Sequence, residues 1–296
     1  MDNLRGAILM VLAMAGFAVE DMFIKLLADA VSVGQILTML GVGGSMVFGA
    51  IVLARGDALF SRNMLSAPII LRGIGDLVGA LAFVSAIVLT PISSASAILQ
   101  ATPLVVTLGA AIFLREPVGW RRWSAIAVGL IGVLLIIRPG LDSFEVLSLL
   151  ALLAVFALAL RDLATRRTPA SIKTMQLSFL GFVAIIPAGI ALMLAQGSPI
   201  VVMNALQTTY FSAALIIGLF SYYAIIAAMR IGDVGFVTPF RYVRLVIALV
   251  IGVAVFGESP DALTLIGAAI IVASGIYTIL RERKVRHHLP KPVAPR

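Results

Sequence analysis

Charged side chains lie within segments of this sequence that are otherwise apolar. Glu20, Asp21 and Lys25 form one such group, and Arg72 and Asp76 form a second. In both groups an acid and a base are four residues apart, so in a helix they share a face and can neutralise one another. A charge at the centre of a bilayer costs at least about 2.5 to 3.5 kcal/mol, so these side chains are candidates for binding an ion or a polar solute.

A third charged group follows a proline late in the sequence. Arg241, Tyr242 and Arg244 come just after Pro239. Proline breaks a helix, which predicts a discontinuous helix with both arginines facing a polar cavity. At a rise of about 1.5 Å per residue, Arg244 lies at the depth of Asp76, so we expect an ion pair between them. Such a pair could instead serve only to lock two helices together.

Uncharged side chains in other apolar segments have suitable chemistry. Gln100 offers an amide for hydrogen bonds, and Tyr222 offers a ring for stacking. Phe17 and Phe83 supply two further rings. We expect these four side chains to line the same cavity as the charged groups.

The two halves of the chain repeat one another. Polar residues of the first half recur in the same order 141 positions later, with Glu20 matching Arg161, Asp21 matching Asp162, Lys25 matching Arg166 and Gln35 matching Gln176. Chance similarity between apolar helices lacks a fixed polar order, so the sequence predicts two copies of one unit. We expect the repeats at residues 1–140 and 141–280, followed by a basic tail at 281–296.

Each half is predicted to hold five spans, so the second half must be inverted in the membrane relative to the first. We therefore expect Lys25 near one mouth of a central cavity, and Asp162 and Arg166 near the other. They are interpreted either as gates or as helix-end pairs at the level of the lipid headgroups. The full set of predicted cavity residues is Phe17, Glu20, Asp21, Asp76, Phe83, Gln100, Arg161, Tyr222, Arg241, Tyr242 and Arg244.

Two further pairs are predicted to be structural. Gln35 and Gln176 occupy matching positions and are expected to form hydrogen bonds between helices. Glu116 and Glu258 each lie at the end of a span just before a proline, where a carboxylate would cap the helix that follows.

The composition predicts that these helices lie in a lipid bilayer. Apolar residues make up 61% of the 296 residues and charged residues only 12%, so a water-soluble surface cannot be assembled. Stretches that can cross a hydrocarbon core of about 30 Å lie near residues 5–27, 34–54, 67–89, 93–114, 122–138, 144–161, 172–195, 207–230, 234–256 and 261–280. They lack the alternating pattern of a β-barrel, so the predicted class is an all-α integral membrane protein.

Several function classes are excluded by residue usage. The sequence has no cysteine, and both histidines, His287 and His288, lie in the polar tail, so no metal site, cofactor or catalytic site is expected and the protein is not predicted to be an enzyme. The net charge of +8 comes from lysines and arginines in alternate loops, which argues against a nucleic-acid partner. That bias predicts an inner-membrane protein with both termini in the cytoplasm.

Two segments resemble a known family. They are residues 113–117, Phe-Leu-Arg-Glu-Pro, and residues 255–258, Val-Phe-Gly-Glu, which resemble the ends of spans four and nine in EamA-type members of the drug/metabolite transporter superfamily. The resemblance implies a basket-like fold of ten helices. In it, spans 1, 3, 4, 6, 8 and 9 line a central substrate cavity, while spans 5 and 10 pack at the side.

Within that family the chain is similar to YddG-type exporters, which implies export of aromatic and other neutral amino acids. No nucleotide-binding loop is found, so we expect a secondary transporter that works by alternating access, either facilitated or driven by an ion gradient. If protons are coupled, Glu20 or Asp76 is the expected carrier. Uptake of drugs, polyamines or nucleotide-type metabolites is an alternative, as is a channel. The chain is expected to work as a monomer in the lipid bilayer.

Overall fold

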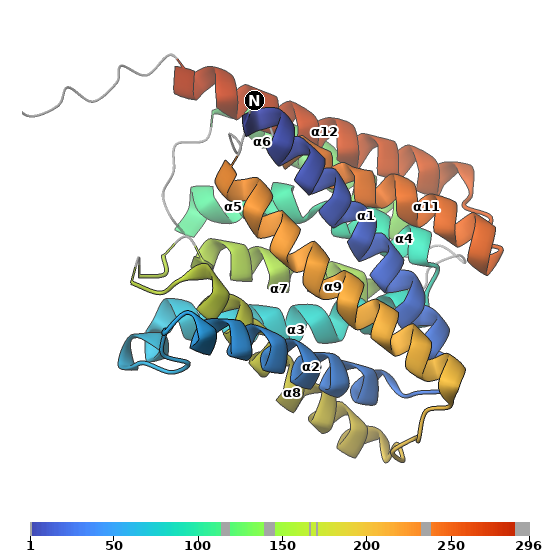
Figure 1. Cartoon of the computed structure of the whole chain (residues 1–296). Coiled ribbons are helices and arrows are strands. Elements are labelled where there is room, and N and C mark those ends of the chain that lie inside the picture. The colour runs from blue at the N-terminus through green and yellow to red at the C-terminus, as the bar shows by residue number, and fades with distance from the viewer. Residues whose placement is uncertain are drawn as a thin grey trace, which may run out of the picture.

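Every regular element in the described part of the chain is a helix (Figure 1). The computed structural model describes residues 2–113, 119–138, 146–165, 167–169, 171–231 and 238–287. The first half contains α1 (Asp2–Ala28), α2 (Val33–Ala54), η1 (Arg62–Leu65), α3 (Ala67–Leu89), α4 (Ile92–Leu99), α5 (Thr102–Phe113) and α6 (Trp120–Ile137). The second half contains α7 (Ser148–Thr165), α8 (Thr174–Gln196), α9 (Ala205–Ile231), η2 (Thr238–Tyr242), α11 (Val243–Phe256) and α12 (Ala262–His287).

These helices form the ten predicted spans and confirm the all-α membrane class. Seven spans are long and apolar enough to cross a bilayer, namely α1, α2, α3, α4 together with α5, α7, α8 and α9. The apolar parts of α6 and α12 are shorter, at Trp123–Ile137 and Ala262–Tyr277. In the ninth span the short helix η2 precedes α11, so the two elements together supply its length.

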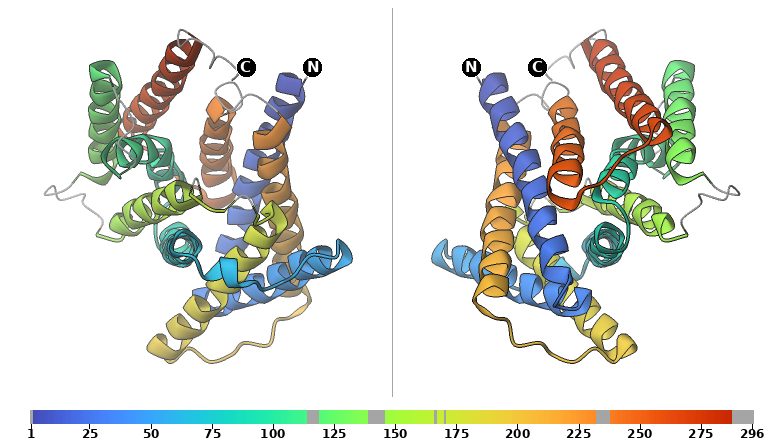
Figure 2. Two further views of the ribbon diagram at one scale, coloured as in Figure 1. Left: turned by 90° about the vertical axis from the view of Figure 1, so that its left-hand side faces the viewer. Right: turned by 90° about the vertical axis from the view of Figure 1, so that its right-hand side faces the viewer.

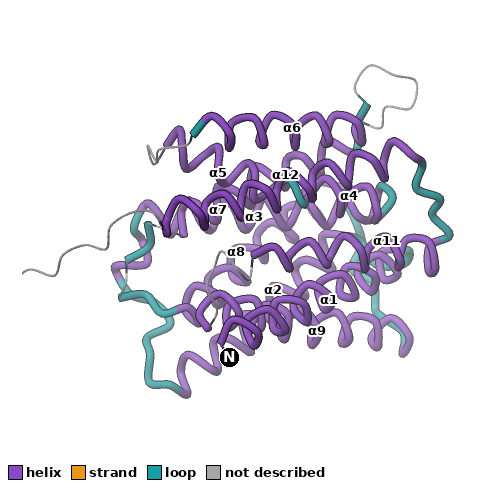
Figure 3. The backbone as a smooth tube through the Cα atoms, turned by 90° about the horizontal axis from the view of Figure 1, so that it is seen from above, coloured by secondary structure: helices purple, strands orange, loops and turns teal. Residues whose placement is uncertain are grey.

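The helices pair as an inverted repeat requires. The most extensive contacts join α1 to α9, α3 to α7, α2 to α8 and α6 to α12 (Figure 3). The repeat relates α1 to α7 and α9 to α3, so the contact between α3 and α7 is the counterpart of the contact between α1 and α9. The helices α2 and α8 are repeat mates of one another, as are α6 and α12. These two contacts therefore lie across the pseudo-twofold axis.

Two glycines let α6 and α12 cross closely. A Cβ atom added at Gly132 would lie 2.8 Å from the carbonyl oxygen of Gly267, and one added at Gly267 would lie 2.6 Å from that of Gly132. Any side chain at either position would push the two backbones apart. Spans five and ten therefore pack on one another.

Two glutamines show the same symmetry in their hydrogen bonds. Gln35 donates through Nε2 to the carbonyl of Val201 at 2.7 Å, and its Oε1 accepts from the amide of the same residue at 2.9 Å. Gln176 donates to the carbonyl of Ala58 at 2.7 Å. Each glutamine ties the start of its own helix to the loop after the partner helix, which confirms the predicted structural role.

The two membrane faces differ in their packing. The first residues of α1 and the last turns of α12 lie on one face, called the terminal face, and the opposite face is called the distal face (Figure 2). The main apolar cluster joins both halves on the distal side and includes the fully buried Ile87, Ile92 and Val155. Two smaller clusters, around Met10 and Met64, lie towards the terminal face. The core is therefore continuous on the distal side and divided on the terminal side.

Candidate functional site

The fourth span is interrupted within the membrane, because α4 ends at Leu99 and α5 begins at Thr102. The side-chain amide nitrogen of Gln100, Nε2, donates to the carbonyl oxygen of Arg241 at 3.1 Å, which joins this break to η2 of the ninth span. The sequence predicted a discontinuous helix around Pro239. The structure has the 3-10 helix η2 there, which continues without a gap into α11, and residues 232–237 lie outside the described residues. The break in the fourth span was not predicted, although Pro103 could have indicated it because proline cannot continue the preceding turn.

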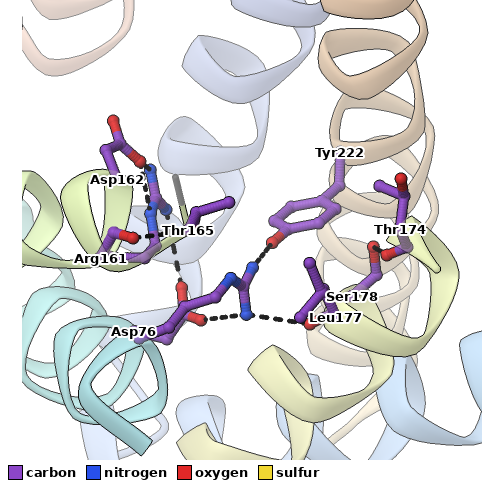
Figure 4. A network of polar contacts seen from close by, with 9 residues as sticks. Asp76, Arg161, Asp162, Thr165, Thr174, Leu177, Ser178 and Tyr222 are labelled. Carbon is purple, nitrogen blue, oxygen red and sulfur yellow. Dashed lines mark hydrogen bonds and ion pairs between the residues drawn. The ribbon is translucent and has the colours of Figure 1, made fainter. Parts of the chain in front are cut away.

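A network of charged side chains joins α3 and α7 on the terminal side of the break in the fourth span (Figure 4). Asp76 lies between two arginines, with Oδ2 2.8 Å from Nη1 of Arg72 and Oδ1 3.7 Å from Nη1 of Arg161. Arg161 also contacts Asp162 through Nε and Nη2, at 3.0 and 2.9 Å. The predicted pair between Arg72 and Asp76 is confirmed, and the buried Asp76 has two cations to match its charge.

Tyr222 of α9 belongs to the same network. Its hydroxyl accepts from Nη2 of Arg72 at 3.0 Å, and Nη1 of that arginine donates to the carbonyl of Leu177 at 3.0 Å. The tyrosine ring packs against Phe48 and Phe182, with centroids 6.0 and 5.6 Å apart. Tyr222 therefore orients an arginine, whereas the sequence predicted a ring available for stacking on a solute.

The ion pair expected between Asp76 and Arg244 is wrong. Arg244 pairs with Asp21, whose Oδ2 accepts from Nε at 3.2 Å and from Nη2 at 2.7 Å. Equal depth does not make helices neighbours: α11 packs against α1, whereas α3 packs against α7. The face of α3 that carries Gly75 packs closely on α7, because a Cβ atom added at Gly75 would lie 2.7 Å from the carbonyl oxygen of Ala157.

Arg244 lies over two aromatic rings. Its Cζ atom is 5.3 Å from the ring centroid of Phe17 and 5.0 Å from that of Phe83. A guanidinium over the face of a ring is stabilised by the ring quadrupole. Nε and Nη2 of Arg244 donate to Asp21, whereas Nη1 has no hydrogen bond to any residue within the described ranges. One edge of a planar, five-donor cation therefore remains available to an anion.

Glu20 has quite different surroundings. No hydrogen bond or ion pair joins it to another described residue, and the charges that act on it are those of the next residue in the chain and of Arg244. It packs against α9 at Gly218, where an added Cβ would lie 2.6 Å from the glutamate carboxyl carbon. Its repeat mate Arg161 packs on Gly75 of α3 in the same manner, with the added Cβ 2.8 Å from the arginine Cβ. The repeat thus holds an acid and a base at equivalent positions.

Lys25 lies at the distal end of the site. Its Nζ donates to the carbonyl of Thr90 at 2.7 Å, lies 3.4 Å from Oε1 of Glu258, and is 5.0 Å from the ring centroid of Phe256. The predicted pair between Asp21 and Lys25 is therefore wrong. Asp21 contacts the start of α11, whereas Lys25, one turn further along α1, reaches the distal ends of α3 and α11.

Glu258 caps a helix of the opposite repeat. Its Oε1 accepts from the amide of Ile92 at 2.6 Å, and its Oε2 accepts from the amide and hydroxyl of Ser93 at 3.1 and 2.6 Å. The sequence predicted that it would cap the following helix, α12. That helix is capped instead by Asp261, which accepts from the amide of Thr264 at 2.9 Å.

The remaining predicted residues have separate places. Arg241 lies in η2, where its carbonyl oxygen accepts the hydrogen bond from Gln100. Tyr242 is buried against Gly275 of α12, and its hydroxyl has no hydrogen-bond partner among the described residues. Arg166 lies outside the described residues. No group of three metal-ligating side chains occurs in the part of the chain that the structure describes.

Comparison with known proteins identifies the family. The model of the EamA-like transporter family matches the chain twice, at residues 4–138 and 147–281. The chain is 28% identical to an S-adenosylmethionine uptake transporter of Rickettsia prowazekii, over 80% of this chain and 81% of that protein. It is 31% identical to a riboflavin transporter of Brucella anthropi, over 69% and 73% of the two chains. A pseudopaline exporter of Pseudomonas aeruginosa is 24% identical over 92% and 94%.

The fold also matches a solved structure. A crystal structure with 20% sequence identity superposes with a TM-score of 0.58 over 93% of this chain and 98% of that chain. The relatives are transporters of small metabolites, and they include both uptake and export proteins. Both halves of the chain match the family model, which covers nearly the whole sequence. The chain therefore belongs to the EamA-like transporter family of the drug/metabolite transporter superfamily, whose members carry small metabolites across membranes and are not enzymes.

Proposed function

We propose that this protein carries a metabolite with an amino-acid head group across the membrane by alternating access. The observation that carries the proposal is the presence of two available opposite charges, Glu20 in the distal half of α1 and Arg244 at the start of α11. Arg244 keeps Nη1 free of hydrogen bonds to described residues, and Glu20 has no ion-pair partner among them. A zwitterion is complementary to this arrangement, because its carboxylate can bind Arg244 while its ammonium group binds Glu20.

The rest of the site favours a solute with an apolar or planar tail. Phe17 and Phe83 flank Arg244, so a tail bound next to the head group would meet aromatic rings. S-adenosylmethionine, the solute in the name of one relative, is an amino acid with a cationic sulfur and an adenosine group. It shares its head group with the neutral amino acids that the resemblance to YddG-type exporters implies. We therefore propose amino acids with bulky tails as the substrate class.

Glu20 is also the residue we propose for proton coupling. A carboxylate without an ion-pair partner can bind a proton and a substrate ammonium group in turn. The charged groups that act on it are Asp21 of α1 and Arg244 of α11, and on α9 it packs against Gly218. Asp76, the other sequence candidate, lies between two arginines, which hold its charge in place.

We further propose a membrane and an orientation in it for this protein. Lysines and arginines gather in the loops of the terminal face, which favours an inner-membrane protein with both termini in the cytoplasm. Export would then run from the terminal to the distal face. One chain supplies both repeats, which supports transport by a monomer.

Counterflow in proteoliposomes tests the proposal. Vesicles preloaded with L-methionine should accumulate labelled L-methionine or S-adenosylmethionine, and methioninol, which lacks the carboxylate, should not compete. Substrate-driven pH change should disappear in Glu20→Gln and persist in Asp261→Asn, whose carboxylate lies at the distal surface. Equal competition by methioninol would refute the head-group assignment. Single-channel conductance in planar bilayers would refute a carrier mechanism.

A further inference from the structure

We propose that Glu258 is the latch of a distal gate. By capping α4 across the two repeats it holds the distal side closed, and it must leave the first turn of α4 before that side can open. This inference rests on the proposed alternating access. Glu258 thereby has a positioning role beyond the helix cap that the sequence predicted.

Both carboxylate oxygens of Glu258 are committed to the other repeat. The three donors are the amide of Ile92 and the amide and hydroxyl of Ser93, at 2.6, 3.1 and 2.6 Å. Ionised acceptors form the stronger hydrogen bonds of proteins, and a helix N-terminus favours a negative charge. The glutamate side chain is only 10% exposed, so water competes weakly for these donors.

The backbone around Glu258 allows its carboxylate to reach the first turn of α4. Gly257 ends α11 in the left-handed region, with φ of 63°, and the amide of Glu258 then donates to the carbonyl of Gly252 at 2.9 Å. At Gly252 itself an added Cβ would lie 2.5 Å from a carboxylate oxygen of the glutamate. The two glycines thus turn the chain back and leave space for the carboxylate beside α11.

Lys25 connects two further helix ends, those of α1 and α3, to Glu258. Its Nζ reaches Glu258 at the end of α11 and the carbonyl of Thr90, directly after α3. The latch therefore holds together the distal ends of α1, α3, α4 and α11, which belong to both repeats. The continuous apolar core lies on the same side of the membrane, so these ends must separate if a solute is to pass.

A depression of about 610 Å³ borders the latch on the distal surface. Its lining includes Lys25, Thr90, Phe256 and Glu258. A reagent in this depression therefore lies beside Glu258 and Lys25, whereas Ala95, on α4, is 1% exposed. Asp261 offers a matched control, because this distal carboxylate caps its own helix and pairs with Arg138 at the end of α6, so it joins only the two side-packed spans.

Site-directed labelling tests the latch. The sequence contains no cysteine, so Ala95→Cys introduces a single thiol under the cap. A membrane-impermeant maleimide is added from the distal side of oriented proteoliposomes. Glu258→Gln, which weakens the cap, and Lys25→Met, which removes the ion pair with Glu258, should each raise the labelling rate about tenfold, the change that about 1.4 kcal/mol of lost stabilisation produces. Asp261→Asn should leave the rate unchanged.

Equal labelling in the parent and in both latch variants would overturn the proposal, as would an equal increase in Asp261→Asn. If Glu258→Gln is not recovered as folded protein, Glu258→Asp replaces it; the shorter side chain keeps the charge but cannot span the amides of Ile92 and Ser93 together, so the same increase is expected. The labelling requires no substrate. Failure of the counterflow panel would therefore leave a positive labelling result standing, and unchanged labelling with intact counterflow would refute the latch alone.

Discussion

Removing the carboxylate of Asp21 should destabilise the protein far more than removing that of Glu20, the preceding residue. The side chains of Asp21 and Arg244 are 6% and 15% exposed, and two N–H groups of the arginine contact one carboxylate oxygen. Asp21→Asn leaves a buried guanidinium without its counter-charge, and loss of one partner from a buried pair costs about 3–5 kcal/mol. Glu20→Gln breaks no ion pair among the described residues, so its cost should stay within about 0.5–1 kcal/mol.

A double-mutant cycle measures this difference. Unfolding in mixed detergent micelles can be followed by the fluorescence of Trp120 and Trp123, the two tryptophans of the chain. Arg244→Met alone should be strongly destabilising because it leaves Asp21 unpaired, whereas the double variant Asp21→Asn/Arg244→Met should lose less than the sum by about 2–3 kcal/mol. Additive effects in the cycle would show that Asp21 and Arg244 do not stabilise one another. A Glu20→Gln variant as unstable as Asp21→Asn would refute the predicted difference between the two residues.

Two further predictions concern helix packing and pH. Gly75→Ala should lower stability by about 1–3 kcal/mol, because the new Cβ would lie 2.7 Å from the carbonyl oxygen of Ala157; Gly73→Ala, whose Cβ meets Ala184 at 3.9 Å, should be neutral in the same unfolding assay. Hydrogen bonds from Arg138 and from Thr264 lower the pKa of Asp261 to about 2. An unfolded aspartate titrates near pKa 3.9, so this contribution to stability is complete above about pH 4 and is lost as the pH falls towards 2. Thermal unfolding of the parent and Asp261→Asn should therefore differ at pH 6 and converge near pH 2, and a constant difference would contradict the assignment.

Features that depend on one stretch of chain were predictable from the sequence. Hydrophobic length indicated the ten spans, and Pro239 indicated that the ninth span does not begin as a regular α-helix, because the 3-10 helix η2 precedes α11. Spacing along one helix indicated the pair between Arg72 and Asp76, because residues four apart share a face. The recurring polar order indicated the inverted repeat, which the paired bonds of Gln35 and Gln176 reproduce in space.

Composition, periodicity and repetition along the chain are therefore enough to predict the membrane location, the helices, the repeat and the charged side chains within the spans. Which of these charges pair depends on how the helices pack. Asp21 pairs with Arg244 across 223 positions of sequence, and Lys25 meets Glu258 across 233. Helix periodicity specifies the depth and the face of a side chain on its own helix. It does not specify the neighbouring helix, which is set by how the two inverted halves pack against each other.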